Sequence, residues 1–337
     1  MDLWEHALGF MDSQILLTAE DIGVFDRLET GPCTLAQIAL ATGLPEDSTE
    51  RLLTALCAMG IVNKLQDGRF VNQPKASEQL VRGKPGYICG TFRHVKYALY
   101  PSWRFFKEAL IERSPQWERA FNGNLPPNKT MYSDAQALRE FLEGMHTITY
   151  EAAAEFASYY CRLKEIDSIV DIGGASGAFV IALAESHPSL QGTVIDLSPV
   201  RSIAEDFFAR HKVLGRIKFH AANFWEDDIP PGADAYSLGF ILHDWDETGG
   251  SILLDKVAKA SKPGGLLIIG EYLLTDDKTG PLFAARSDLN MLVAARGRER
   301  TAQEYREWVV RFGFELEEIY RTSKGKAFML ARRPQGV

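Results

Sequence analysis

One histidine stands at the end of an apolar run that indicates a buried strand. In the stretch FILHDWDE, residues 240–247, His243 follows three apolar side chains and precedes two aspartates. Imidazole is the usual proton acceptor near pH 7, and a nearby carboxylate orients the ring and stabilises its protonated form. Glu271, expected at the end of the next strand, and Glu299, in a charged turn before the last helix, are the candidate carboxylates. The pattern therefore predicts His243 as a general base supported by two glutamates.

The same residues also allow a purely structural interpretation. A histidine at a strand end can simply pack there, and Asp244 or Asp246 can cap the following helix. The sequence DET upstream of the apolar ILL favours Asp246 as this cap, and Asp244 is predicted to contact the substrate or to flank a cofactor. We interpret Trp245 as a packing residue. Since a glutamate is expected at the adjacent strand end, the catalytic interpretation of His243 is preferred.

A second motif, VDIGGASGAF, indicates a strand, a glycine turn and a helix. Its glycines are Gly173, Gly174 and Gly177. They allow a ligand to approach the backbone closely and to meet the N-terminus of the helix. A dinucleotide fingerprint would need glycine where Ile172 stands, so that assignment fails. Asp171, at the end of the strand, would repel a pyrophosphate but suits a cationic amino group.

The next two strands end in groups that suit a nucleoside. Asp196 lies 19 residues after Gly177, where an acid accepts hydrogen bonds from ribose hydroxyls. Asn223 and Phe224 end the third strand and offer an amide for the adenine edge and a ring for its face. The acid, the glycine turn, the ribose acid and the adenine platform together predict a site for S-adenosylmethionine. The competing interpretation is a turn glycine with a capping aspartate.

The two motifs belong together because ligands of open α/β sheets bind outside the carboxyl ends of the strands. Moving a methyl group from a sulfonium to a phenol is an in-line displacement. The phenol has a pKa of about 10 and is a poor nucleophile until it is deprotonated. His243 would supply that base. We expect no metal, since the sequence shows no carboxylate cluster beyond the acids already given roles.

The chain is predicted to have an α/β fold in three parts. Residues 1–100 show helices, then a helix–turn–helix and a hairpin, which is typical of a winged-helix-like domain. Residues 101–165 are helical and aromatic, and form a linker that contributes to the substrate pocket. In residues 166–337, short apolar runs alternate with helices, which predicts a Rossmann-like, seven-stranded parallel sheet. Its last two strands have no helix between them and should pair as an antiparallel hairpin.

Composition restricts the partners. The net charge is −8, so no global basic field favours nucleic acid or a membrane surface. The predicted recognition helix begins PEDSTER, where DNA phosphates would require lysine or arginine, and a DNA-binding regulator is therefore disfavoured. No apolar run approaches the roughly 20 residues of a membrane span. Without a signal-like start, and with four scattered cysteines, the expected location is the cytoplasm.

These motifs resemble the winged-helix class I O-methyltransferases that depend on S-adenosylmethionine, a family with plant caffeate-type, bacterial polyketide and acetylserotonin branches. DIGGASGAF is similar to the family's cofactor loop and LHDWDE to its catalytic segment. GFMDSQILLTAEDIGVFD resembles its dimerising helices, and GPLFAARSDLNMLVAARGRERTAQEY resembles its C-terminal substrate segment. The resemblance covers nearly the whole chain, and the acetylserotonin branch looks most similar.

The resemblance implies a homodimer with intertwined N-terminal helices, in which Phe10 and Met11 reach toward the partner's pocket. It supports the roles of the base, its two glutamates, the ribose acid and the glycines given above. It also places Thr149 near the cofactor. The residues expected to line the pocket of a small, flat aromatic acceptor are Met145, Asn290, Met291, Trp103 and Phe141.

Two positions depart from the family pattern. Asn223 stands where aspartate is common, and Gly239 stands where many members have lysine or arginine, which removes a contact on the cofactor side. Because some relatives of this fold have abandoned methyl transfer, the fold alone does not fix the reaction. Methylation of carbon or nitrogen, non-methylating chemistry and a catalytically silent dimer partner therefore remain as alternatives to O-methyl transfer.

Overall fold

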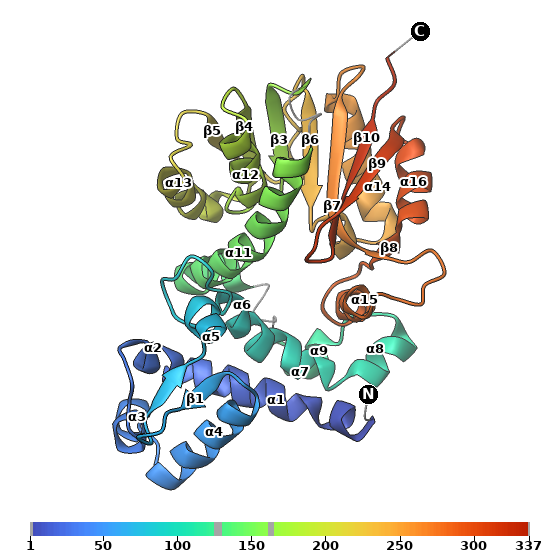
Figure 1. The fold of residues 1–337 in the computed structure, drawn as a ribbon. Coiled ribbons are helices and arrows are strands. Elements are labelled where there is room, and N and C mark those ends of the chain that lie inside the picture. The colour runs from blue at the N-terminus through green and yellow to red at the C-terminus, as the bar shows by residue number, and fades with distance from the viewer. Residues whose placement is uncertain (1–2, 125–129, 161–164, 336–337) are drawn as a thin grey trace.

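The computed structural model describes residues 3–124, 130–160 and 165–335, and Figure 1 shows two lobes joined by a layer of helices. The N-terminal lobe contains α1 (Leu3–Asp21), α2 (Val24–Glu29), α3 (Leu35–Thr42), α4 (Glu46–Ala58), β1 (Val62–Lys64), β2 (Phe70–Asn72) and α5 (Pro74–Gln79). No described helix is long and apolar enough to cross a membrane.

The N-terminal lobe has the predicted order of helix, turn, helix and hairpin. Thr34 and Gln37 form a capping box at the start of α3, and Gly43, with a φ of 70°, ends that helix. The strands β1 and β2 then pair as an antiparallel hairpin. Two helices precede this motif. Gly23, which has a left-handed backbone with a φ of 77°, lies between them and is the N-cap residue of α2.

The connecting layer is built around the long helix α11 (Ala135–Tyr159). The preceding elements are α6 (Gly90–His94), η1 (Val95–Leu99), α7 (Tyr100–Trp103), α8 (Phe106–Glu112), α9 (Trp117–Ala120) and η2 (Met131–Ser133). Two glycines allow α6 and α11 to meet backbone to backbone. A Cβ on Gly90 would overlap the carbonyl oxygen of Glu140, and one on Gly144 would lie 2.6 Å from the backbone nitrogen of Thr91.

The C-terminal lobe holds the main sheet. Its strands are β3 (Ser168–Ile172), β4 (Gln191–Asp196), β5 (Ile217–Ala221), β6 (Ala235–Gly239), β7 (Leu266–Leu274), β8 (Arg300–Thr301), β9 (Glu315–Arg321) and β10 (Lys326–Arg332). The order is β5-β4-β3-β6-β7-β10-β9, with β8 paired to the end of β7. The pairs among β3 to β7 are parallel, and β10 is antiparallel to both neighbours. The predicted sheet and its final hairpin are confirmed, and β8 is a two-residue addition.

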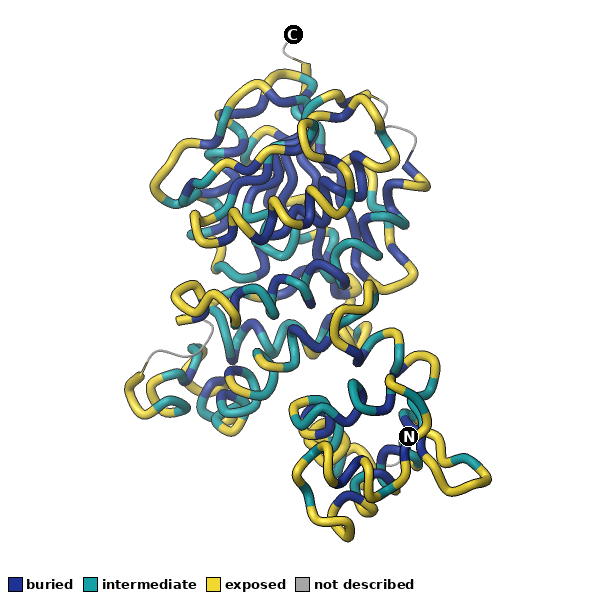
Figure 2. Tube along the Cα trace, turned by 90° about the vertical axis from the view of Figure 1, so that its left-hand side faces the viewer, coloured by how far each residue is buried: buried dark blue, intermediate teal, exposed yellow. Residues whose placement is uncertain are grey.

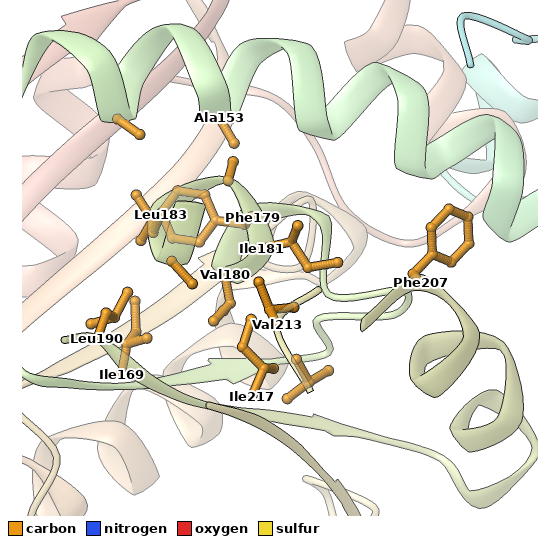
Figure 3. Packing of buried hydrophobic residues seen from close by; sticks show 14 of the residues in the cluster. Ala153, Ile169, Phe179, Val180, Ile181, Leu183, Leu190, Phe207, Val213 and Ile217 are labelled. Atoms are coloured by element: carbon orange, nitrogen blue, oxygen red, sulfur yellow. The ribbon is translucent and has the colours of Figure 1, made fainter. Parts of the chain in front are cut away.

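Helices cover both faces of this sheet, as Figure 1 shows. One face packs against α11, α12 (Ala178–Ser186) and α13 (Arg201–Arg210), and the other against α14 (Glu247–Ala260) and α16 (Ala302–Val310). Side chains of β3 alternate between the two cores, with Ile169 in the first and Val170 and Ile172 in the second. Figure 2 shows the sheet strands buried inside this lobe, and Figure 3 shows Ile169 among the first core.

The contact between α6 and α11 leads to a prediction about stability. We expect Gly90→Ala to lower the free energy of unfolding by about 3 kcal/mol, because its methyl group has no space against the α11 backbone. Thermal unfolding followed by circular dichroism would measure the loss. Gly249→Ala is the matched control, since a Cβ there meets its neighbours at 3.4 Å or more. Equal midpoints for the two variants would contradict the close helix contact.

Candidate active site

The glycine turn lies between β3 and α12 at the carboxyl ends of the parallel strands. Gly173 and Gly177 have φ values of 67° and 76°, which side-chain-bearing residues rarely adopt. Gly174 is required for a different reason, because a Cβ there would lie 2.5 Å from Oδ2 of Asp171. The turn therefore brings its backbone directly against a carboxylate.

Asp171 is buried beside this turn. Its Oδ1 accepts a hydrogen bond of 2.7 Å from the hydroxyl of Ser237. Burial raises the pKa of Asp171 to about 7, against the lowering effects of Ser237 and of the Lys326 charge. A cation placed against Asp171 would restore the ionised carboxylate. This chemistry fits the amino group of S-adenosylmethionine.

Asp196 ends β4, as the sequence predicted. Its Oδ2 accepts from the backbone nitrogen of Ala175 at 2.9 Å, and its Oδ1 accepts from Leu197 at 2.7 Å. Burial raises the pKa of Asp196 to about 6. Each carboxylate oxygen keeps a further acceptor site, so the arrangement is compatible with ribose hydroxyls while it ties Asp196 to the glycine turn.

Asn223 and Phe224 lie two and three residues beyond the end of β5, rather than at its end. The ring of Phe224 lies over the glycine turn, 3.6 Å from the position of a Cβ on Gly173. The side-chain oxygen of Asn223 accepts a hydrogen bond of 3.1 Å from the backbone nitrogen of Trp225. Asn223 thus shapes the loop that carries Phe224, and its contact with adenine stays a prediction.

Two neighbours of the turn were not assigned from the sequence. His146 of α11 shares a 2.8 Å hydrogen bond with the hydroxyl of Ser176, and its ring stacks on Phe207 with centroids 3.8 Å apart. Burial lowers the pKa of His146 to about 3, so the ring is neutral. It holds the glycine turn through its hydrogen bond with Ser176. Its place in the helix toward the cofactor was the one available signal.

Tyr132 of η2 is a second residue near the site. Burial raises the pKa of Tyr132 to about 12, and the charges of Asp196 and Asp244 add to this effect. The side chain is 40% exposed, so the phenol lies at the edge of the site, where the charges of Asp196 and Asp244 reach it. No motif around residue 132 indicates this role, because the proximity arises only from folding.

His243 does not end the strand as expected, because β6 stops at Gly239. It lies instead on the short turn η5 (Leu242–Asp244), where it is buried. Its Nδ1 lies 2.9 Å from Oε1 of Glu299 and 3.6 Å from Oε2 of Glu271. Donation from Nδ1–H to Glu299 leaves Nε2 as the basic nitrogen of the neutral ring. Nε2 lies 3.7 Å from Oδ1 of the half-exposed Asp244.

Glu271 is not a strand end either, because β7 continues to Leu274. It comes one residue after Gly270, which pairs with the last residue of β6. Its Oε1 accepts hydrogen bonds of 3.1 Å from the backbone nitrogens of Ile241 and Leu242. Glu271 therefore builds the turn that carries the histidine. Its Oε2 is buried and has no hydrogen-bond partner among the described residues.

Glu299 lies in the segment before α16, as predicted. Its Oε1 also accepts a hydrogen bond of 2.7 Å from the hydroxyl of Ser287, and its backbone nitrogen donates to Asp288 at 2.9 Å. Both residues belong to α15 (Leu282–Ala294). The carboxylate that orients the imidazole is thus held by the helix that the sequence assigned to the acceptor pocket.

Arg300 stabilises the turn that carries His243, a role that was not predicted from the sequence. Its guanidinium donates to the carbonyl oxygens of Leu242 and Trp245, both at 3.2 Å. The same group lies 4.2 Å from the ring centroid of Trp308. The one signal in the sequence was an arginine directly after the predicted Glu299. Asp246 caps α14 through the backbone nitrogen of Gly249 at 2.8 Å, as expected.

Burial alone would lower the pKa of His243. The charges of Glu271, Asp244 and Glu299 outweigh it and raise the pKa to about 10. Burial raises the pKa of Glu271 to about 7, against the effect of the imidazolium. The unprotonated ring is therefore a strong base, with a pKa close to that of a phenol, about 10, while the imidazolium is the main form at neutral pH.

The same three side chains, His243, Glu271 and Glu299, could ligate a cation, since one donor atom of each lies within 4.8 Å of the others. Their present hydrogen bonds serve another purpose, because Glu271 supports the turn and Glu299 orients the ring. The donor set thus fits a buried base with its carboxylates, and metal independence remains a prediction.

The predicted acceptor residues fall into two groups. On α7 and α15, Trp103 donates its indole N–H to Oδ1 of Asn290 at 3.1 Å, and the adjacent Met291 is buried. On α11, residues at a spacing of four share one face of the helix. They are Phe141, Met145 and Thr149.

A cavity of about 300 Å³ lies beside the start of α11. Its lining includes Phe141, His94 and Met131. Of the predicted acceptor residues, only Phe141 lines this cavity. The structure therefore brings Trp103 together with Asn290, while the joint pocket of all these residues stays a prediction.

The strand order, the acid beside a glycine turn and the second acid at the end of β4 define a class I methyltransferase fold. Comparison with known proteins agrees. A model described as an O-methyltransferase dimerisation domain matches residues 4–82, and one described as an O-methyltransferase domain matches residues 103–315. The chain belongs to this O-methyltransferase family and uses S-adenosylmethionine as its cofactor.

Individual relatives support this assignment. The chain is 35% identical to a 3-hydroxy-5-methyl-1-naphthoate 3-O-methyltransferase of Streptomyces sahachiroi, with 91% of this chain and 87% of the relative covered. It is 32% identical to the acetylserotonin O-methyltransferase of Gallus gallus, over 98% and 96%. A crystal structure of human N-acetylserotonin methyltransferase with S-adenosylmethionine superposes with a TM-score of 0.89 at 26% identity, over 99% of this chain and 97% of that one.

The contact between Gly174 and Asp171 leads to a second prediction. We expect Gly174→Ala to weaken the binding of S-adenosylhomocysteine at least about tenfold, because the added methyl group displaces the carboxylate. Isothermal titration calorimetry would measure the dissociation constant, with Gly249→Ala as the control. Unchanged affinity in a folded Gly174→Ala variant would show that Asp171 does not bind the cofactor.

Proposed function

We propose that this enzyme methylates a hydroxyl group of a small aromatic acceptor, with His243 as the general base. The observation that carries the proposal is the 2.9 Å hydrogen bond between Nδ1 of His243 and Glu299. It fixes the ring so that Nε2 is the proton acceptor. The named activities of the two relatives, on a hydroxynaphthoate and on acetylserotonin, support an aromatic acceptor.

In this proposal Asp171 holds the amino group of the cofactor, Asp196 holds its ribose, and Phe224 faces its adenine. When bound, S-adenosylmethionine supplies an electrophilic methyl group on a sulfonium. Thr149 of α11 is proposed to line the same side of the site as the three glycines. Asn223 contributes by shaping the loop under Phe224. Contacts of Asp171, Asp196 and Phe224 with the glycine turn support these proposed roles.

On the acceptor side, Nε2 of His243 takes the proton of the hydroxyl group. Its pKa of about 10 is close to that of a phenol, so the proton moves with little cost in free energy. Glu299 orients the ring. Glu271 holds the turn and stabilises the positive charge that develops on the imidazole. Asp244, Met145, Asn290, Met291, Trp103 and Phe141 are the residues proposed to surround the acceptor.

We also propose a homodimer formed through α1. Four apolar side chains of this helix are exposed: Leu3, Trp4, Phe10 and Met11, with relative exposures of 82%, 69%, 54% and 46%. A second copy of the chain is the occupant supported by the match of residues 4–82 to a dimerisation domain. Burying these side chains would remove apolar area from water.

The experiment for the reaction is transfer of a trideuteromethyl group to a panel of phenols, hydroxyindoles, hydroxynaphthoates and hydroxyquinones, followed by mass spectrometry. We expect a methyl ether, and a loss of about 10²–10⁴-fold in kcat/KM for His243→Gln. In the wild type, kcat/KM should rise with pH above neutrality, because the active form of the base is unprotonated and its pKa is raised.

His220→Gln is the control, since His220 is exposed on β5. Full activity in His243→Gln would exclude this residue as the base. A labelled product bearing its methyl group on carbon or nitrogen would favour the alternative chemistries. Tight cofactor binding without any product would indicate a member that does not transfer methyl groups.

Metal independence gives a separate prediction. Because both glutamates are engaged in hydrogen bonds that build the base, dialysis against EDTA should leave kcat unchanged within about twofold. Methyl transfer measured before and after chelation, with and without added Mg²⁺, checks this. Activity lost on chelation and restored by the ion would show instead that the buried cluster binds a metal.

A further inference from the structure

The first residue of β10, Lys326, is a buried lysine that none of the roles above uses. Its relative exposure is only 2%. Lysine is almost never fully buried unless its charge is compensated, because removing an ammonium group from water is costly. Lys326 pairs in register with Tyr272, next to Glu271 on the neighbouring strand. The register therefore places Lys326 close to the part of β7 that carries Glu271.

Two glycines make room for this side chain. Gly239 and Gly270 are register partners across β6 and β7. A Cβ on Gly270 would lie 3.2 Å from Cε of Lys326, and a Cβ on Gly239 would lie 3.7 Å from its Nζ. The side chain of Lys326 thus extends from β10 past Gly270 and Gly239. Larger residues at these two positions would leave it less space. Its ammonium ends beside Gly239.

The ammonium meets an aromatic ring that also contacts the base. Nζ lies 3.5 Å from the ring centroid of Phe240, an arrangement that favours the cation. The same ring stacks on the imidazole of His243, with centroids 5.4 Å apart and an interplanar angle of 27°. Phe240 has a φ of 56°, which is strained for an aromatic residue and persists only where its surroundings enforce it.

The charges of three carboxylates from different elements act on the ammonium: Glu271 on β7, Asp171 on β3 and Glu299 before β8. Burial lowers the pKa of Lys326 to about 8, while these acids act to raise it. In return, its charge acts to lower the pKa of Asp171 and of Glu271, which burial raises. Lys326 is thus coupled to one acid on the cofactor side and one on the catalytic side.

We propose that Lys326 is a positioning residue of the methyl-transfer site, whose buried ammonium beside Gly239 balances the charges of Asp171 and Glu271 and anchors Phe240 against His243. The inference rests on the proposed cofactor role of Asp171. It also gives a function to the gap at Gly239, because the ammonium of Lys326 occupies the space beside it.

The test is the pH dependence of S-adenosylhomocysteine binding between pH 6 and 8.5, measured by calorimetry on the full chain. In the wild type, affinity should fall as the pH drops through the pKa of Asp171, about 7, because the protonated acid no longer attracts the ammonium group. The charge of Asp196 raises the pKa of Asp171, and Asp196, with a pKa of about 6, adds a second loss of affinity near pH 6 that wild type and variant share. Lys326→Met should move this midpoint upward by about one pH unit. Affinity would then be about tenfold weaker at pH 6.5 and nearly equal at pH 8.5.

Two further variants sharpen the test. Lys324→Met is the matched control, because Lys324 is an exposed lysine two residues away that pairs with Glu151, and its curve should match the wild type. Gly239→Lys combined with Lys326→Met places a cation in the same gap from β6 and should restore the wild-type midpoint. This double variant also carries the test if Lys326→Met alone does not fold.

Superimposed pH curves for the wild type and a folded Lys326→Met would overturn the inference. A double variant that keeps the shifted midpoint would overturn it as well. A flat curve for the wild type would be a different failure, because it would remove Asp171 from cofactor binding and so contradict the proposed function. In the kcat profile for methyl transfer, Lys326→Met should show a matching alkaline shift, which a purely structural lysine would not produce.

Discussion

The contact between His243 and two buried carboxylates is the constraint on which the rest of the site depends. A charged carboxylate is stable away from water only when it is paired or hydrogen-bonded. Glu271 meets this requirement by accepting two backbone N–H groups, and Glu299 by accepting from Ser287 and the imidazole. The strand β7, the turn η5 and the helix α15 must therefore meet at one point. The position of His243 follows from the hydrogen bonds that the two buried glutamates require.

The cofactor side obeys the same rule with a different outcome. Asp171 and Asp196 are enclosed by the glycine turn, and burial raises the pKa of both carboxyl groups. Their ionised forms become favourable when a cation or hydroxyl donors arrive. In the proposed mechanism, binding of a positively charged sulfonium ligand and preparation of the base are thus linked through one set of buried charges. Lys326 belongs to this set through its position beside Gly239 and Phe240.

Local sequence patterns predicted the elements more accurately than their ends. The alternation of strands and helices gave the sheet and its final hairpin, because a buried parallel sheet requires apolar runs with helical connections. The expected strand ends at His243 and Glu271 were wrong for the same reason. Apolar residues continue through the turn η5 and through β7, so hydrophobicity does not mark where hydrogen bonding to a neighbouring strand stops.

The sequence by itself determined the residue types that the chemistry needs: a glycine turn preceded by an acid, a histidine after an apolar run, and two glutamates. Their spacing along the chain carried that information because each motif is local. Only the tertiary structure decided which partners they have. Arg300, His146 and Lys326 act across separate elements, and contacts between residues distant in sequence arise from packing that no local pattern records. The same physical reason placed Tyr132 near Asp196 and Asp244.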